Sequence, residues 1–265
     1  MTTRPELTLA LLQFDTVWHD PAANRQQLTD RIAAASHCRL LVLPETFSTG
    51  FTLDAAEHAE TVDGPTSQWL REQSTEHEVD ICGSLIINDG GRHFNRLLWA
   101  TKNGELHHYD KRHLFRMGDE HRNFSPGQER LIMQIDDWRI CPLVCYDLRF
   151  PVWSRNRNDY DLLLYVANWP TARHSAWTSL LPARAVENQS YVAGVNRSGR
   201  DGNGVESSGD SVVFDYLGRT LARAGTAPET LTATLSLNKL RRYREKFPAW
   251  RDADRFTLLD NPDPV

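Results

Sequence analysis

The chain has 265 residues, of which 40% are hydrophobic and 25% are charged. This composition excludes a disordered, collagen-like or coiled-coil protein, and the length suits one large α/β domain over residues 1–265. The net charge is −5 at pH 7 and the chain has no basic block, so nothing indicates nucleic-acid binding. No apolar run reaches the roughly 18 residues that span a bilayer. We therefore expect a cytoplasmic protein with neither a nucleic-acid nor a membrane partner.

The chain begins with an alternation of buried strands and helices. Residues 7–14 form an apolar run typical of a strand, and Asp20 and Pro21 then provide a cap and a first turn for a helix that ends near Ser36. Residues 39–43 return as a second buried strand. A strand, a helix and a strand with short connections predict a parallel crossover.

Hairpin signals follow a second predicted helix at residues 65–76. An Asp-Gly turn at 88–91 separates two strand-like runs, 79–87 and 92–101, and a turn at 103–104 sends the chain back toward Lys111. Residues 112–128 show no periodicity and are expected to form a long loop. Loops of this length in a compact domain are usually functional.

The rest of the chain resumes the alternation and supports two sheets covered by helices better than one sheet. We expect turns at 198–209 and a basic helix from Lys239. The other elements expected here are strands at 131–135, 138–145, 161–167, 191–196, 211–215, 219–225 and 230–236, and helices at 151–158 and 175–189.

Four cysteines lie mostly in apolar strand-like runs, where we expect them to be reduced: Cys38, Cys82, Cys141 and Cys145. Cys145 differs because it ends a strand and is followed by polar residues that lead into a helix. A helix N-terminus there would lower the thiol pKa, and the backbone N–H of Tyr146 would face a developing oxyanion. A strand-end cysteine is nevertheless more often a small buried hydrophobe.

Glu45 and Lys111 also follow predicted strands. Because open α/β sheets place their sites at the carboxyl ends of strands, an acid, an amine and a thiol could meet there as base, oxyanion stabiliser and nucleophile. Taken singly, each charge is more readily explained as a solvated loop residue.

Histidines at 107, 108 and 113 raise the question of a metal site. Neighbouring residues on a strand point to opposite faces of the sheet, and no pair of carboxylates lies at ligand spacing. We therefore expect no metal ion at these histidines.

Three segments of the chain resemble the signature segments of the carbon–nitrogen hydrolase (nitrilase) superfamily: Leu43–Phe47, Tyr109–Phe115 and Cys145–Pro151. They occur in the family's order and at fitting separations, and the similarity covers nearly the whole chain. Three further segments most resemble the bacterial omega-amidase branch: Arg116–His121, Trp153–Asn156 and Arg244–Trp250. Val152 departs from the many relatives that carry a glutamate after Phe-Pro.

This resemblance implies a four-layer α-β-β-α sandwich and a catalytic triad of Glu45, Lys111 and Cys145. Glu120 matches a second family glutamate through its spacing to Phe124 and Gly127. The implied reaction is hydrolysis of the terminal amide of a small omega-amido α-keto acid through a thioester, without a cofactor. The alternatives are a hydrolase of N-carbamoyl amino acids or other small amides, a non-catalytic interaction module, and a metal hydrolase.

An α-keto acid substrate carries a carboxylate, which an arginine fork would bind at two points. Arg173 is the preferred candidate because it follows the strand-end segment that contains Trp169. Arg116 is the second candidate. Arg149 is the third, since its position inside the nucleophile segment suggests a structural ion pair.

Relatives with the sandwich commonly form dimers through the face that bears the nucleophile's helix, so we expect a homodimer. The tail at about 239–265 is also rich in apolar side chains, with Leu240, Tyr243, Phe247, Trp250 and Phe256. The tail would pack either on a partner subunit or on its own domain.

Overall fold

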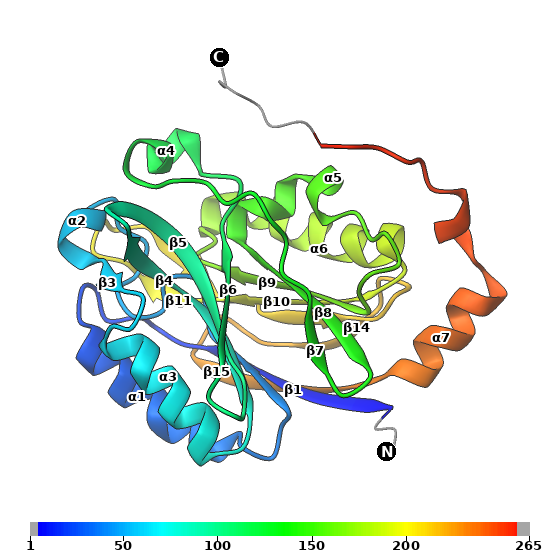
Figure 1. Ribbon diagram of the computed structural model, residues 1–265, viewed down its shortest axis with the longest axis horizontal. Coiled ribbons are helices and arrows are strands. Elements are labelled where there is room, and N and C mark those ends of the chain that lie inside the picture. Colours follow the sequence, from blue (N-terminus) through cyan, green and yellow to red (C-terminus); the bar gives the residue numbers. More distant parts are fainter. Residues whose placement is uncertain (1–4, 259–265) are drawn as a thin grey trace.

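Two β-sheets pack face to face, with helices on their outer faces, in the computed structural model, which describes residues 5–258 (Figure 1). Helices α1 (Pro21–Ala34) and α3 (Pro65–Glu76) cover the first sheet. Helices α5 (Pro151–Ser154) and α6 (His174–Asn188) lie on the side of the second sheet. The expected four-layer α-β-β-α sandwich is confirmed.

The first sheet contains the predicted parallel crossover, because β1 (Glu6–Gln13) is parallel to β2 (Leu40–Val42) and β2 is parallel to β4 (Asp80–Asp89). The hairpin of β4 and β5 (Arg92–Ala100) turns at Gly90 and Gly91, which both have positive φ. The strand order is β15 (Glu229–Ser236), β1 (Glu6–Gln13), β2 (Leu40–Val42), β4 (Asp80–Asp89), β5 (Arg92–Ala100) and β6 (Leu106–Asp110), and β3 (Glu60–Thr61) pairs with β4. Since β5 is antiparallel to both neighbours, β2, β4 and β6 end at one edge of the sheet.

The second sheet has a parallel centre of three strands, β8 (Trp138–Val144), β9 (Leu162–Ala167) and β10 (Tyr191–Asn196). Its order is β14 (Thr220–Arg223), β13 (Val212–Phe214), β10 (Tyr191–Asn196), β9 (Leu162–Ala167), β8 (Trp138–Val144) and β7 (Met133–Ile135). The three central strands are buried along their length, as the apolar runs predict. Their carboxyl ends also meet at one edge.

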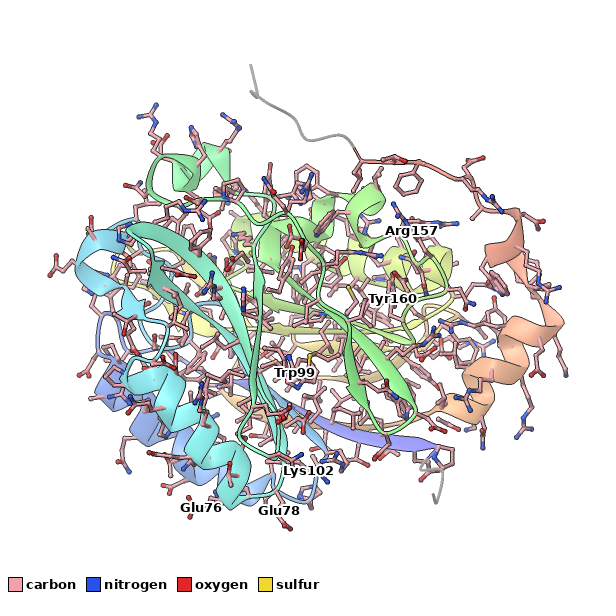
Figure 2. The ribbon with its side chains drawn as sticks, in the orientation of Figure 1. Glu76, Glu78, Trp99, Lys102, Arg157 and Tyr160 are labelled. Carbon is pink, nitrogen blue, oxygen red and sulfur yellow. The ribbon has the colours of Figure 1, made fainter. Side chains whose placement is uncertain are left out.

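The period-2 pattern of β1 explains how the layers are held together. Leu7, Leu9 and Leu11 point into the core between the sheets, whereas Ala10 and Leu12 belong to the core under α1 and α3. Trp99 lies in the space between the sheets and donates its indole N–H to Asp80 at 2.9 Å (Figure 2). The apolar residues of β1 are therefore divided between two cores.

Several short elements differ from the expectation. The loop at 112–128 contains η1 (Arg116–Gly118) and the one-turn helix α4 (Glu120–Asn123), and the turns at 198–209 include a hairpin of β11 (Ser198–Arg200) and β12 (Glu206–Ser208). Helix α5 ends at Ser154 instead of residue 158. Helix α2 (Ala55–His58) and β3 were not expected. Elements of two to four residues are too short to show a periodic pattern.

The C-terminal segment packs on its own domain through helix α7 (Leu237–Lys246), followed by η4 (Ala249–Asp252). Leu240 is fully buried, and Arg244 binds the carboxylate of Asp161 at 2.6 Å. Phe247 is 57% exposed. Residues 259–265 of the expected tail lie outside the described residues. Within residues 5–258, the helices are all too short or too polar to cross a bilayer.

Candidate active site

The three strand-end residues identified from the sequence lie in one cavity of about 320 Å³. Glu45 follows β2, Lys111 directly follows β6, and Cys145 directly follows β8. The first two come from one sheet and the third from the other. The cavity therefore lies where the carboxyl ends of the two sheets meet.

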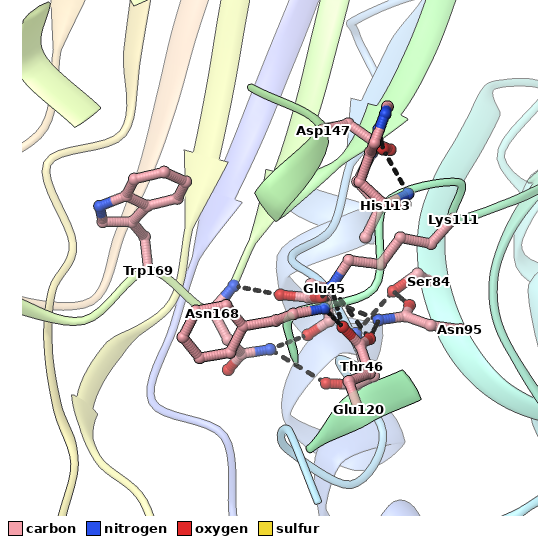
Figure 3. A network of polar contacts seen from close by, with 12 residues as sticks. Glu45, Thr46, Ser84, Asn95, Lys111, His113, Glu120, Asp147, Asn168 and Trp169 are labelled. Atoms are coloured by element: carbon pink, nitrogen blue, oxygen red, sulfur yellow. Dashed lines mark hydrogen bonds and ion pairs between the residues drawn. The ribbon is translucent and has the colours of Figure 1, made fainter. Parts of the chain in front are cut away.

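Lys111 is buried between two carboxylates (Figure 3). Its Nζ donates to Glu45 Oε1 at 2.9 Å, and to Glu120 Oε1 and Oε2 at 3.0 and 2.9 Å. All three side chains are at most 1% exposed. A buried ammonium is stable here because each of its hydrogens has an anionic acceptor.

The charges of this cluster act on one another. Burial alone would lower the pKa of Lys111, but the carboxylates of Glu120 and Glu45 outweigh burial and raise it. Burial raises the pKa of Glu120, and so does Glu45, against the opposing effect of Lys111. Lys111 is therefore cationic at neutral pH.

Cys145 occupies a constrained position, with φ of +44°, at the start of the 3₁₀ turn η2 (Cys145–Arg149). Its side chain is partly exposed to the cavity. Burial and the carboxylate of Glu45 raise the pKa of the thiol well above its usual value, although Lys111 acts in the opposite direction. The expectation of a low thiol pKa is wrong, because burial and the carboxylates outweigh Lys111. The thiol is protonated at neutral pH.

Two asparagines that the sequence analysis did not select hold Glu45 in place. Asn95 of β5 donates its amide to Glu45 Oε1 at 2.8 Å and to Glu120 Oε1 at 3.1 Å, and it accepts from Ser84 Oγ at 2.8 Å. Asn168, directly after β9, donates its backbone N–H to Glu45 Oε2 at 2.8 Å. The sequence signal for Asn95 was an amide side chain within a predicted strand. The signal for Asn168 was its position directly after one.

The spacing of Glu120 to Phe124 and Gly127 has a packing reason. Phe124 is buried in a small cluster with Ile86 and Leu114, which anchors the end of α4. The N–H of Gly127 donates to the carbonyl of Lys111 at 3.0 Å, and a Cβ at Gly127 would lie 2.1 Å from a backbone oxygen of Asp110. Only glycine fits this close approach.

Two arginines line the same cavity. Arg149 of η2 lies over the ring of Trp169, and Arg173 of η3 (Thr171–Arg173) lies over the ring of Phe115, with guanidinium-to-centroid distances of 5.2 and 4.9 Å. In the part of the chain that the structure describes, neither arginine forms an ion pair. The expectation of a structural ion pair for Arg149 is therefore wrong. Arg116 lies outside the lining of the cavity.

A family model, carbon–nitrogen hydrolase, matches residues 8–245. The chain belongs to this family. It is 48% identical over 255 residues to the omega-amidase YafV of Escherichia coli K12, covering 96% of this chain and 99% of that protein. It is 35% identical to a 2-oxoglutaramate amidase of Bacillus subtilis, covering 92% and 96%.

A solved structure of the carbon–nitrogen hydrolase superfamily has the same fold. XC1258 from Xanthomonas campestris, which carries an arsenic adduct in its active site, matches with a TM-score of 0.94 and 46% identity over 96% of this chain and 99% of that chain. The resemblance stated from the sequence is confirmed. This carbon–nitrogen hydrolase is an enzyme that hydrolyses C–N bonds.

Replacing Glu45 and replacing Lys111 should shift the pH dependence of Cys145 alkylation in opposite directions. Glu45→Gln removes a negative charge that raises the thiol pKa, so the midpoint for reaction with iodoacetamide should move to lower pH. Lys111→Ala removes a positive charge that lowers this pKa, so the midpoint should move to higher pH. Mass spectrometry of the alkylated peptide measures both, and Cys145→Ala gives the background. Shifts of the same sign would contradict this account of the site.

Proposed function

We propose that this enzyme is an omega-amidase, which hydrolyses the terminal amide of a small α-keto acid of the 2-oxoglutaramate or 2-oxosuccinamate type. The observation that carries the proposal is the buried ion cluster of Glu45, Lys111 and Glu120 in contact with the cavity of Cys145. The similarity to the omega-amidase and the 2-oxoglutaramate amidase supports the same substrate class.

In the first half of the proposed reaction, Glu45 takes the proton of the Cys145 thiol while Sγ attacks the amide carbonyl. Proton transfer during the attack suits a thiol with a raised pKa, since no free thiolate has to accumulate. The tetrahedral oxyanion is held by the Lys111 ammonium and the Tyr146 backbone N–H. Glu45 returns the proton to nitrogen, the C–N bond breaks, and ammonia leaves a thioester on Cys145.

In the second half, Glu45 takes a proton from water, which attacks the thioester. The carboxylic acid leaves and the thiol regains its proton. Two of the three bonds of Lys111 go to the same carboxylate of Glu120, so releasing one of them frees a hydrogen for the oxyanion. Glu120 lies outside the lining of the cavity, which favours a role in holding Lys111 over a role in polarising water.

Ammonia release tests this proposal. Cys145→Ala should abolish release from 2-oxoglutaramate, whereas Cys141→Ala, a buried cysteine of the same strand, should retain it. Lys111→Ala should lower turnover by roughly 10²–10³-fold, as expected for a lost oxyanion donor. Glu45→Gln should lower it by at least about 10²-fold, as expected for a lost general base.

The choice of substrates separates the alternatives. Faster release from an N-carbamoyl amino acid than from 2-oxoglutaramate would favour the other branch, and no turnover of any amide would favour an interaction module. No step of the proposed reaction needs a cofactor, so a chelator should leave the rate unchanged. Inhibition that added zinc reverses would favour a metal hydrolase.

We further propose that Arg173 and Arg149 bind the substrate's carboxylate, with Trp169 as part of the cavity wall. Both guanidinium groups are held against aromatic rings in the cavity of Cys145, and no carboxylate of residues 5–258 is paired with them. A guanidinium that is positioned but not neutralised is available for an anion. This proposal adds Arg149 to Arg173 and sets Arg116 aside, because Arg116 does not line the cavity.

Charged and neutral amides should respond differently to the loss of these arginines. Arg173→Ala and Arg149→Ala should each raise the KM for 2-oxoglutaramate by an equivalent of about 2 kcal/mol, the lower end for a lost charge pair because both side chains are partly exposed. The KM for a neutral amide of the same length should stay constant. Equal losses on both substrates would mean that the arginines support the fold, and a loss confined to Arg116→Ala would move the assignment there.

We also propose that the protein is cytoplasmic and forms a homodimer. Each subunit would be one domain that spans residues 1–265. The four cysteines are free thiols, which suits a reducing compartment. Val186 of α6, Phe247 and Trp250 are 52%, 57% and 36% exposed. Gln189 at the end of α6 bonds to the backbones of both Phe247 and Trp250, so these three apolar side chains belong to one region of the surface.

Light scattering at micromolar concentration should give twice the chain mass of 30.3 kDa. Phe247→Glu should reduce the measured mass to that of one chain, because it places a charge in the apolar region. Val62→Glu replaces an exposed valine beside β3 and should leave the dimer intact. A wild-type protein of single-chain mass would contradict the dimer.

A further inference from the structure

The carboxylate of Asp147 connects the two chain segments that carry Lys111 and Cys145. Asp147 is fully buried and stands two residues after Cys145. Its Oδ2 accepts from the backbone N–H of Val144 at 3.0 Å and from the Tyr109 hydroxyl at 2.7 Å. Its Oδ1 accepts from the backbone N–H and from Nδ1 of His113, at 3.0 and 2.7 Å. Figure 3 shows the pair of Asp147 and His113 next to Lys111.

The residues that donate to this carboxylate are sequence neighbours of Lys111 and Cys145. Tyr109 lies two residues before Lys111 and His113 lies two residues after it, while Val144 directly precedes Cys145. Lys111 and Cys145 belong to different sheets, so the backbone ladders of the sheets do not fix their relative position. The four bonds of Asp147 supply a direct connection between the two segments.

Neighbouring contacts restrict the same groups further. The ring of His113 stacks on Phe150 with centroids 3.7 Å apart, and Trp153 donates its indole N–H to the Tyr109 hydroxyl at 3.0 Å. On the other side of η2, Arg184 of α6 donates to the carbonyl of Leu148 at 2.7 Å. The turn that holds Cys145 at positive φ is therefore bonded on both sides.

We propose that Asp147, with His113 and Tyr109 as its side-chain donors, is a positioning residue that sets the alignment of Cys145 Sγ against the Lys111 ammonium. The proposal rests on the thiol chemistry proposed for Cys145, but it does not depend on which amide is the substrate. Attack on a carbonyl requires the reacting atoms within about 3–3.5 Å, and a displacement of ~1 Å can cost about 10²-fold in rate. A shift between the two segments therefore lowers the rate of the chemical step and leaves binding at the arginines intact.

A pair of substitutions at His113 tests the proposal. His113→Leu removes the side-chain bond to Asp147, and we expect kcat to fall by about 10–100-fold at constant KM. His113→Asn places an amide N–H near the position of Nδ1, so it should recover most of this loss. Recovery would distinguish a lost hydrogen bond from lost packing. Rates are measured per folded site on the amide that the wild-type enzyme hydrolyses fastest.

A variant at the start of β8, the strand that Cys145 follows, controls for effects on stability. Arg139→Met breaks the bonds of Arg139 to Asp161, at 3.0 and 3.1 Å, at the start of β8, about 20 Å along the strand from Cys145. It should lower Tm without changing kcat.

Tyr109→Phe gives a second test if His113→Leu does not fold, because it removes one hydroxyl and should lower kcat at constant KM.

Three outcomes would overturn the positioning role: wild-type kcat in both His113→Leu and Tyr109→Phe, no recovery in His113→Asn, or a loss of kcat in Arg139→Met that parallels the loss of Tm. Full activity of Cys145→Ala would instead overturn the proposed function. An inactive Cys145→Ala together with fully active His113→Leu and Tyr109→Phe would reject the positioning role alone.

Discussion

The buried ammonium of Lys111 between Glu45 and Glu120 is the constraint on which the rest of the site depends. Two carboxylates and one ammonium, all removed from water, are stable only when every acceptor and donor is satisfied. The surrounding amides meet this requirement, since Asn95 bonds to both glutamates and Asn168 bonds to the second oxygen of Glu45. Burial of Cys145 and the carboxylate of Glu45 together raise the pKa of the nearby thiol, so the thiol keeps its proton at neutral pH.

The two-sheet architecture brings these charges together from distant parts of the chain. Glu45 and Lys111 follow parallel strands of one sheet, so the backbone ladder brings them to the same edge. Cys145 and Asn168 follow neighbouring parallel strands of the other sheet. The apolar residues between the sheets, with Trp99 among them, hold the two edges against each other. Packing of the core thus determines how the charged residues of one sheet lie relative to Cys145 of the other.

Local patterns predicted the strand ends, the two sheets covered by helices and the positions of Glu45, Lys111 and Cys145, because each depends on a run of apolar residues and the point where it stops. They could not predict the partners across the sheets. Asn95 lies within a strand, and its role depends on two glutamates that are 50 and 25 residues away. The thiol pKa was misjudged for the same reason, since burial of Cys145 and the carboxylates of Glu45 and Glu120, from other parts of the chain, raise it. The ion pair expected for Arg149 was misjudged because its guanidinium packs over the ring of Trp169, which follows another strand.

The hairpin of β11 and β12 contributes to the cavity but lies outside the two sheets that carry the reactive residues. Asp201, Val205 and Ser207 of this segment form one wall of the cavity, but the two strands belong to neither large sheet. Its base is fixed by bridges from Ser198 to Asp15 and from Ser207 to Pro170. Lengthening an exposed loop costs little free energy, about 0.6 kcal/mol for each doubling of its length. Insertions at the tip could therefore reshape the cavity for longer or bulkier amides while the ion cluster and the core between the sheets stay unchanged.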